Sequence, residues 1–260
     1  MIRFTDSMKR CRHTAKAFVS PFVSAAVNFI YPPTCLFCDQ EINAAGHNFC
    51  ESCQSKLTSA MSLECPRCGA PVGPYTDLTR GCGQCHRETF AFDGVIRLGV
   101  YDGPMRLASL RAKATGGGSL ARGLANVLVD QKRAKFHEWG FDLVVPIPEH
   151  WTRRLLHPHY AAETISRQIA RSLNVRWSRK ILLKSRRTPK QATSPTPLRR
   201  QQQQDSFAVS SSRQISGKTI LLVDDILTTG STAHAAARTL KNAGATKVIV
   251  AVIAVSPLRK

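Results

Sequence analysis

The segment "ILLVDDILTTGST", residues 220–232, decides the fold, because a continuous apolar run ends there in two acids and a loop of small hydroxyl residues. An apolar run without alternation predicts a strand buried on both faces, as in a parallel sheet. Asp224 and Asp225 then stand at the carboxyl end of that strand, where open α/β sheets bind their ligands. A helical pattern follows from Ala233 to Asn242, and Gly244 is its stop signal.

The loop between strand and helix, Thr228-Thr229-Gly230-Ser231-Thr232, has the composition of an anion-binding loop. Successive backbone N–H groups at the positive end of a helix dipole bind phosphate, and hydroxyl groups add further donors. Gly230 lets the backbone approach a ligand closely. The loop is neither a Walker A loop nor a dinucleotide fingerprint, because both consensus patterns are absent.

Two acids beside a phosphate loop need hydroxyl groups or Mg²⁺ as partners, since a bare carboxylate would repel the phosphate. A ribose 5-phosphate meets both needs. The loop takes the phosphate, while Asp224 and Asp225 take the ribose 2- and 3-hydroxyls and any Mg²⁺ bound there. The alternative that needs no ligand is a capped helix that follows two solvated acids.

The chain from residue 91 onward alternates apolar runs with helical patterns. The predicted strands are residues 95–103, Asp142–Ile147 and 247–255, with "RKILLKS" at 179–185 as a further short strand. The predicted helices are residues 104–135, broken by Gly116-Gly117-Gly118, and Tyr160–Leu173. Residues 185–217 have the composition of a loop. The predicted fold class is therefore α/β, with a doubly wound, mainly parallel sheet.

Eight of the nine cysteines form four Cys-x-x-Cys pairs. The pairs are Cys35/Cys38, Cys50/Cys53, Cys65/Cys68 and Cys82/Cys85. Two thiolate pairs complete one tetrahedral Zn²⁺ site, so the spacing predicts two structural zinc ions in a double zinc ribbon. Sequential pairing is the simplest assignment, and an interleaved arrangement is the alternative. Such thiolates favour a reducing compartment, so we expect a cytoplasmic protein.

The charge of the chain is strongly basic, with 37 Lys or Arg against 17 acids and a net charge of +20. Residues 151–218 alone hold 15 Lys or Arg and two acids. This excess indicates a polyanionic partner, nucleic acid first and an anionic membrane second. Residues 17–31 are mostly apolar but too short to span a bilayer, so we expect a helix that packs on the body or touches a membrane surface. A cleaved signal sequence is the alternative.

The stretch "LLVDDILTTGST" resembles the phosphoribosyl-pyrophosphate (PRPP) motif of type I phosphoribosyltransferases. The resemblance implies PRPP binding by Asp224, Asp225 and residues 228–232, with Mg²⁺ as cofactor and the two acids as candidate catalytic residues. Candidates for the pyrophosphate side are Lys113, Arg153 and Arg154, since negative charge accumulates on the leaving group.

A double zinc ribbon ahead of such a domain resembles the ComF family of competence-related proteins, as do "YPPTCLFC" from residue 31 and "VVPIP" from residue 144. The expected division is a basic and apolar helical segment at 1–34, the zinc ribbon at 35–90 and the phosphoribosyltransferase-like domain at 91–260. The resemblance implies a role in DNA uptake, with single-stranded DNA and other uptake proteins, such as a helicase-like protein, as partners. The candidate DNA contacts are Arg179, Lys180, Arg186 and Arg187. An active transferase with an unidentified small acceptor is the alternative.

Overall fold

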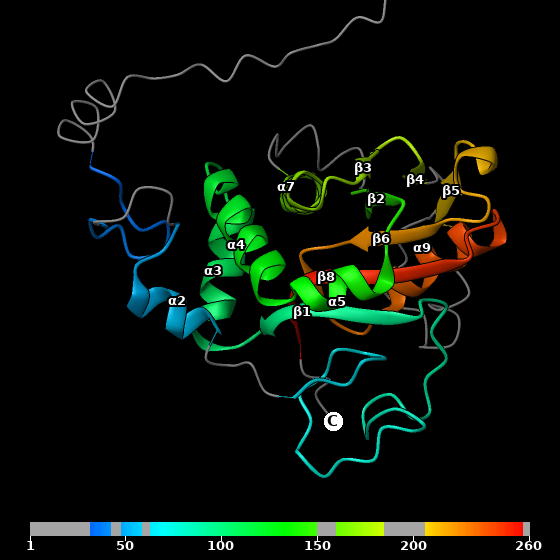
Figure 1. The fold of residues 1–260 in the computed structure, drawn as a ribbon, viewed down its shortest axis with the longest axis horizontal. Coiled ribbons are helices and arrows are strands. Elements are labelled where there is room, and N and C mark those ends of the chain that lie inside the picture. Colours follow the sequence, from blue (N-terminus) through cyan, green and yellow to red (C-terminus); the bar gives the residue numbers. More distant parts are fainter. Residues whose placement is uncertain (1–31, 43–47, 59–62, 150–159, 185–205, 257–260) are drawn as a thin grey trace, which may run out of the picture.

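The computed structural model describes residues 32–42, 48–58, 63–149, 160–184 and 206–256 (Figure 1). The strands are β1 (Gly94–Val100), β2 (Leu143–Pro146), β3 (Arg176–Trp177), β4 (Leu182–Lys184), β5 (Phe207–Val209), β6 (Thr219–Val223), β7 (Ile226–Leu227) and β8 (Lys247–Val255). The helices are α2 (Glu51–Thr58), α3 (Gly103–Lys113), α4 (Gly118–Gln131), α5 (Arg133–Trp139), α7 (Ala161–Leu173) and α9 (Ser231–Asn242), with a short 3₁₀ turn η1 (Ser212–Gln214).

The main sheet has the order β1-β8-β6-β2-β3, and β7 also pairs with β8. Every pairing in this sheet is parallel, which confirms the predicted sheet type. Because the strands are parallel, their carboxyl ends meet at one edge and their amino ends at the other. The arrowheads of β1 and β6 point to the left in Figure 1, so the carboxyl edge lies on that side.

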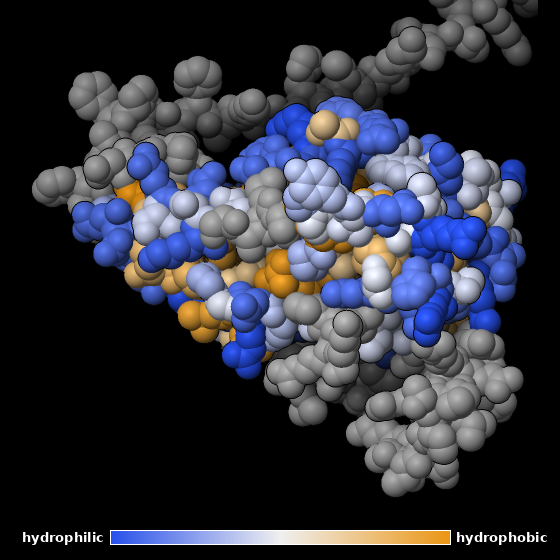
Figure 2. Space-filling model, turned by 90° about the horizontal axis from the view of Figure 1, so that it is seen from below, coloured by the Kyte–Doolittle hydropathy of each residue, from blue (hydrophilic) through white to orange (hydrophobic). Residues whose placement is uncertain are grey.

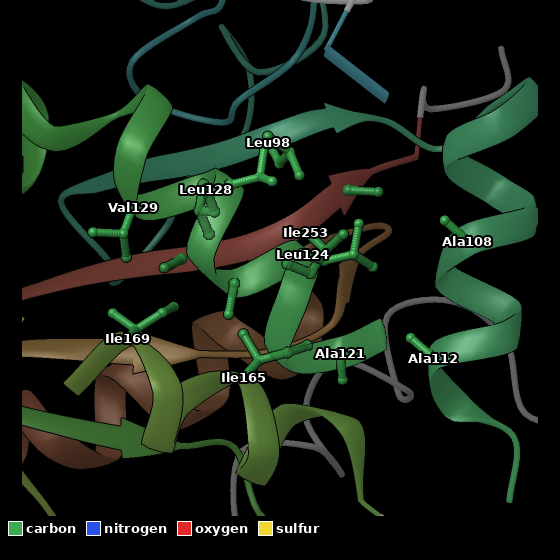
Figure 3. Close-up of a cluster of buried hydrophobic side chains, with 14 of the residues drawn as sticks. Leu98, Ala108, Ala112, Ala121, Leu124, Leu128, Val129, Ile165, Ile169 and Ile253 are labelled. Atoms are coloured by element: carbon green, nitrogen blue, oxygen red, sulfur yellow. The ribbon is translucent and has the colours of Figure 1, made fainter. Parts of the chain in front are cut away.

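Helices cover both faces of the sheet, as the continuous apolar strands require. Helices α3, α4, α5 and α7 contribute to the core on one face, and α9 packs on the other. Figure 3 shows Leu124 and Leu128 of α4 beside Ile165 and Ile169 of α7, close to Ile253 of β8. Alternate residues of each strand serve the two cores, so the sheet is buried on both sides.

Three details differ from the sequence expectations. Helix α9 begins at Ser231, two residues earlier than its apolar pattern suggested, because Gly230 is its N-cap. The predicted loop at 185–217 contains β5, which pairs antiparallel with β4. The two-residue strand β7 was not predicted. Strands of two or three residues carry too little periodicity to be seen in a sequence.

The surface seen from below is mostly hydrophilic, with smaller hydrophobic areas between the polar residues (Figure 2). Leu107 and Leu110 of α3 are among the exposed large hydrophobic residues. Within the described part of the chain, no helix is both long and apolar enough to cross a membrane. The predicted helix within residues 1–34 lies mostly outside the described residues.

Candidate functional site

The two acids lie where β6 ends, at the carboxyl edge of the sheet. The backbone N–H of Asp224 donates to the carbonyl oxygen of Ala251 in β8 at 3.1 Å, which ties the acid pair to the centre of the sheet. The Asp224 carboxylate accepts the N–H of Asp225 at 2.9 Å, and the Asp225 carboxylate accepts the N–H of Ile226 at 2.7 Å. These bonds fix both side chains before any ligand arrives.

A cation from a distant helix meets the acid pair. Lys113, the last residue of α3, places its Nζ 3.0 Å from Oδ2 of Asp225. The Lys113 side chain is 42% exposed and that of Asp225 is 17% exposed, so the ion pair lies at the mouth of the site. The sequence assigned Lys113 to the pyrophosphate side, and the structure brings it to the acids.

Burial and mutual repulsion set the charge state of the acids. Asp224 keeps part of its surface exposed, but desolvation of its carboxyl group and the neighbouring charge of Asp225 raise its pKa to about 8. Lys113 opposes this shift. Burial also raises the pKa of Tyr160, whose hydroxyl donates to the carbonyl oxygen of Ile147. Two carboxylates that repel each other favour a ligand that brings a cation or hydroxyl donors.

The phosphate-loop candidate, residues 228–232, contains a left-handed residue directly before α9. Gly230 has φ +75° and is the N-cap of α9, where it has no side chain to bond the helix N–H groups. The hydroxyl groups of Thr229 and Ser231 lie 2.9 Å apart, and the Ser231 N–H points to the Thr229 oxygen at 3.4 Å. The first turn of α9 therefore presents N–H groups and hydroxyls together, as an anion site requires.

The segment that follows the second zinc ribbon lies against this loop. A Cβ atom built on Gly230 would be 3.2 Å from the Phe90 ring, and Phe90 stacks on Phe92 with ring centroids 4.6 Å apart. The N–H of Ala91 donates to Nδ1 of His234 in α9 at 3.2 Å. Sequence reasoning missed Phe90 and His234 because they are 144 positions apart and no local pattern links them.

The eight paired cysteines form two groups, one from Cys35, Cys38, Cys50 and Cys53 and one from Cys65, Cys68, Cys82 and Cys85. In each group all four sulfurs lie within 4.8 Å of one another, which confirms sequential pairing over the interleaved alternative. Sulfurs around a tetrahedral zinc ion with bonds of about 2.3 Å lie about 3.8 Å apart. The distance is 3.8 Å for Cys38 and Cys50, and 3.7 Å for Cys65 and Cys85.

The electrostatics of both groups fit a divalent cation. Burial opposes ionisation of Cys35, but backbone N–H groups of its own turn and of Cys50 lower its pKa to about 6. Burial raises the pKa of Cys53 in the same group and of Cys68 in the other. One favoured thiolate among disfavoured neighbours needs a metal ion before all four can ionise. Both groups are therefore structural Zn²⁺ sites of the closed, four-thiolate kind.

Most of the other basic residues predicted from the sequence cannot be placed near the acid pair. Arg153, Arg154, Arg186 and Arg187 lie outside the described residues. Arg179 is described and forms an ion pair with Glu163 at 3.2 Å, so an acid partly offsets its charge. Lys180 is exposed, next to Arg179.

Comparisons with known proteins agree with this two-part organisation. Residues 155–259 match the phosphoribosyl transferase domain family, and residues 26–86 match the double zinc ribbon domain family. The chain thus combines a double zinc ribbon with a phosphoribosyltransferase-type α/β domain. No curated protein matches the sequence.

Several solved structures are similar to part or most of the chain. Glutamine PRPP amidotransferase from B. subtilis is 20% identical over 52% of this chain and 27% of that chain, with a TM-score of 0.36. Adenine phosphoribosyltransferase from Saccharomyces cerevisiae is 15% identical over 80% of this chain and 90% of that chain, with a TM-score of 0.35. The chain also spans 25% of an allosteric regulatory enzyme of purine biosynthesis, at 20% identity and a TM-score of 0.36.

Proposed function

We propose that this protein binds PRPP together with Mg²⁺ at the carboxyl edge of its sheet. The observation that carries the proposal is the pairing of two fixed acids with a helix N-terminus on one edge, where the N-cap residue Gly230 has no side chain to occupy the N–H groups. The phosphate-loop candidate, residues 228–232, would hold the 5-phosphate through N–H and hydroxyl donors. Asp224 and Asp225 would hold the ribose hydroxyls and the Mg²⁺ ion, which neutralises pyrophosphate charge when bound.

The charges at the acid pair support this assignment. A buried carboxyl group with a raised pKa beside a second carboxylate is unfavourable in an empty site. A ligand that brings Mg²⁺ and hydroxyl donors would remove that cost, and no apolar ligand would. Lys113 already compensates Asp225 at 3.0 Å and would face the pyrophosphate as PRPP enters.

We further propose that single-stranded DNA is a partner, as expected for a ComF-like protein of DNA uptake. The net charge of +20 and its concentration in residues 151–218 support a polyanionic partner. The zinc ribbons would position the α/β domain or a partner protein, since four-thiolate sites are structural. Two thiolate-rich zinc sites also favour a cytoplasmic location, with peripheral membrane contact through the N-terminal segment.

Transferase activity is the second candidate function, and the position of Lys113 favours it. A cation beside the acid pair could stabilise the departing pyrophosphate while an acceptor atom forms a new bond to ribose C1. This activity predicts pyrophosphate release from PRPP in the presence of the correct acceptor. PRPP binding without any release across a panel of nitrogen bases would favour a binding role instead.

Calorimetry with PRPP tests the proposed site. Wild type should bind PRPP only with Mg²⁺, and Asp225→Asn should lose about 1.5–3 kcal/mol of binding free energy, because a charged acceptor is removed. Asp130→Asn is the matched control, since Asp130 on α4 is exposed and, among the described residues, pairs with Arg133. No heat from wild type at millimolar PRPP, or equal affinities of both variants, would show that the ligand is wrong.

A further inference from the structure

The amino edge of the sheet, opposite the acid pair, carries a row of basic residues. Lys247 begins β8, Lys218 directly precedes β6, and Arg176 begins β3. These strands and β2 are neighbours in the order β8-β6-β2-β3. With about 4.8 Å between neighbouring strands, the row spans about 14 Å. In Figure 1 the strands begin on the right, and Figure 2 shows that end covered mainly by hydrophilic residues.

The acids on this edge are engaged with the protein itself. Asp142 accepts the backbone N–H of Thr219 at 2.8 Å. Asp93 accepts the N–H of Val248 at 2.8 Å and pairs with Lys241 at 2.6 Å. Both carboxylates thus fix the starts of strands and keep their negative charge, and the exposed Asp142, directly before β2, lies between the basic residues of β6 and β3.

A surface hollow of about 540 Å³ continues the row where α7 ends and β3 begins. Its lining residues are Arg167, Ala170, Arg171, Asn174, Val175, Arg176 and Trp177. The Arg167 guanidinium lies 4.4 Å from the centre of the Trp177 ring, whose Nε1 donates to Ser166 at 2.9 Å. Arg171 and Arg176 are exposed, and neither pairs with a carboxylate among the described residues. The hollow therefore combines two exposed guanidinium groups, one of which donates to the Gln214 carbonyl oxygen at 3.5 Å, with a fixed aromatic ring.

We infer that this hollow and the basic row form the binding site for single-stranded nucleic acid. The inference rests on the proposed DNA partner and adds a place on the fold, with Arg171, Arg176 and Lys218 from the basic stretch 151–218 and Lys247 from outside it. Three basic residues spread over about 14 Å suit the repeated phosphates of a single strand. Planar guanidinium and indole groups in a hollow suit bases, which stack on aromatic and arginine planes.

The position of this site distinguishes it from a membrane-binding surface and from the proposed PRPP site. A flexible single strand can pass from the hollow along the row of charges, which favours nucleic acid over a membrane surface. The site also lies at the opposite edge of the sheet from the acid pair, so PRPP and the strand contact different residues. Both ligands should therefore bind at once, without competing for a side chain.

The test measures anisotropy of a fluorescent 20-mer of thymidine on the full-length protein, from about 20 to about 200 mM salt. Arg171→Glu/Arg176→Glu should weaken binding at least tenfold and reduce the salt slope by about 1.4, since each phosphate contact on a single strand contributes about 0.7. The matched control is Arg106→Glu/Arg122→Glu, which makes the same charge change at exposed positions of α3 and α4. The control should bind within about threefold of wild type, and both double variants should keep the wild-type melting temperature.

The outcomes distinguish the inference from the proposed function. Equal weakening by both double variants would mean that only net charge matters, which overturns the site. If Arg171→Glu/Arg176→Glu weakened binding to anionic vesicles but not to DNA, the surface would belong to a membrane contact. If polyglutamate displaced the DNA completely, the surface would belong to an acidic protein. Either result would overturn the inference. PRPP calorimetry is run on the same samples. Absent PRPP binding with the expected DNA pattern would refute the PRPP assignment and leave the DNA site standing.

Discussion

Substitution of Gly230 separates backbone strain from contact strain in the candidate phosphate loop. Gly230 has φ +75°, and a left-handed conformation costs a residue with a Cβ about 1–2 kcal/mol. Alanine also lowers the conformational entropy of the unfolded chain, which offsets about 0.4–1 kcal/mol of this cost. The new Cβ would also stand 3.2 Å from the Phe90 ring, which is held by Phe92 and by the Arg67 guanidinium 5.9 Å from its centre. Moving that ring adds about 1 kcal/mol.

The structure supplies a matched control at Gly217. It has φ +73°, almost the value of Gly230, but apart from its chain neighbours a Cβ there would meet no atom of the described residues within 4 Å. We therefore expect Gly217→Ala to cost about 1 kcal/mol of unfolding free energy and Gly230→Ala about 2 kcal/mol. Gly230→Val should cost more than Gly230→Ala, because a β-branched side chain also crowds the phosphate.

Thermal unfolding and PRPP calorimetry read out the two effects. The melting temperature should fall by about 2–4 °C for Gly217→Ala and by about twice that for Gly230→Ala. PRPP affinity should stay unchanged in Gly217→Ala and fall at least tenfold in both Gly230 variants, because the loop can no longer close on the phosphate. Equal melting temperatures for the two alanine variants, together with unchanged PRPP affinity, would refute the reasoning.

Three further predictions concern the zinc content, the Thr229 hydroxyl group and the charge of Asp224. Elemental analysis should find two Zn²⁺ per chain, and Cys35→Ser should lose one ion and destabilise the first ribbon; one ion or none in reduced wild type would contradict this. Thr229→Ala should weaken PRPP binding less than Gly230→Val, by about 0.5–1.5 kcal/mol, since backbone donors remain; a larger loss by calorimetry would argue against the loop geometry. Asp224→Asn should stabilise the ligand-free protein by about 1–3 kcal/mol at pH 8 and hardly at pH 4. The raised pKa of Asp224 means that its ionisation destabilises the folded state more and more between these two pH values. Denaturant unfolding at both pH values checks the sign of the difference.

The sequence was informative where chemistry is local. Residues 220–232 predicted the order of strand, acids, loop and helix because each signal lies within a few positions of the next. The cysteine pairs predicted both metal groups for the same reason. The sequence could not show that Lys113 reaches Asp225 across 112 positions, since that contact depends on how α3 packs beside the sheet.

The basic site on the amino edge shows a second limit of local reasoning. Lys247, Lys218 and Arg176 belong to three separate segments, and only the strand order makes them neighbours. The sequence placed Lys218 and Arg176 within the basic stretch 151–218, but it named runs such as Arg186-Arg187 as the contacts, because charge is dense along the chain there.

The second zinc ribbon, with Cys65, Cys68, Cys82 and Cys85, packs against the candidate phosphate loop and the sheet and is not a separate appended module. Its Glu64 is nearly buried and pairs with the buried Arg97 of β1 at 3.5 Å, and also with Lys132 and Lys135. Such a cluster contributes little net stability, because desolvation offsets the attraction, but loss of one partner would leave a buried charge unpaired, which holds its members together.

The arrangement of Glu64 and its partners also positions the candidate phosphate loop. With Glu64 fixed on β1 and the helices, the adjacent Cys65 and the rest of the second ribbon are fixed too, and the chain leaves the ribbon with Phe90 against Gly230. The first ribbon contacts a different region, since Arg111 of α3 donates to the carbonyl oxygen of Phe37. The two ribbons therefore brace the site from two directions, one behind the phosphate loop and the other behind the helix that delivers Lys113.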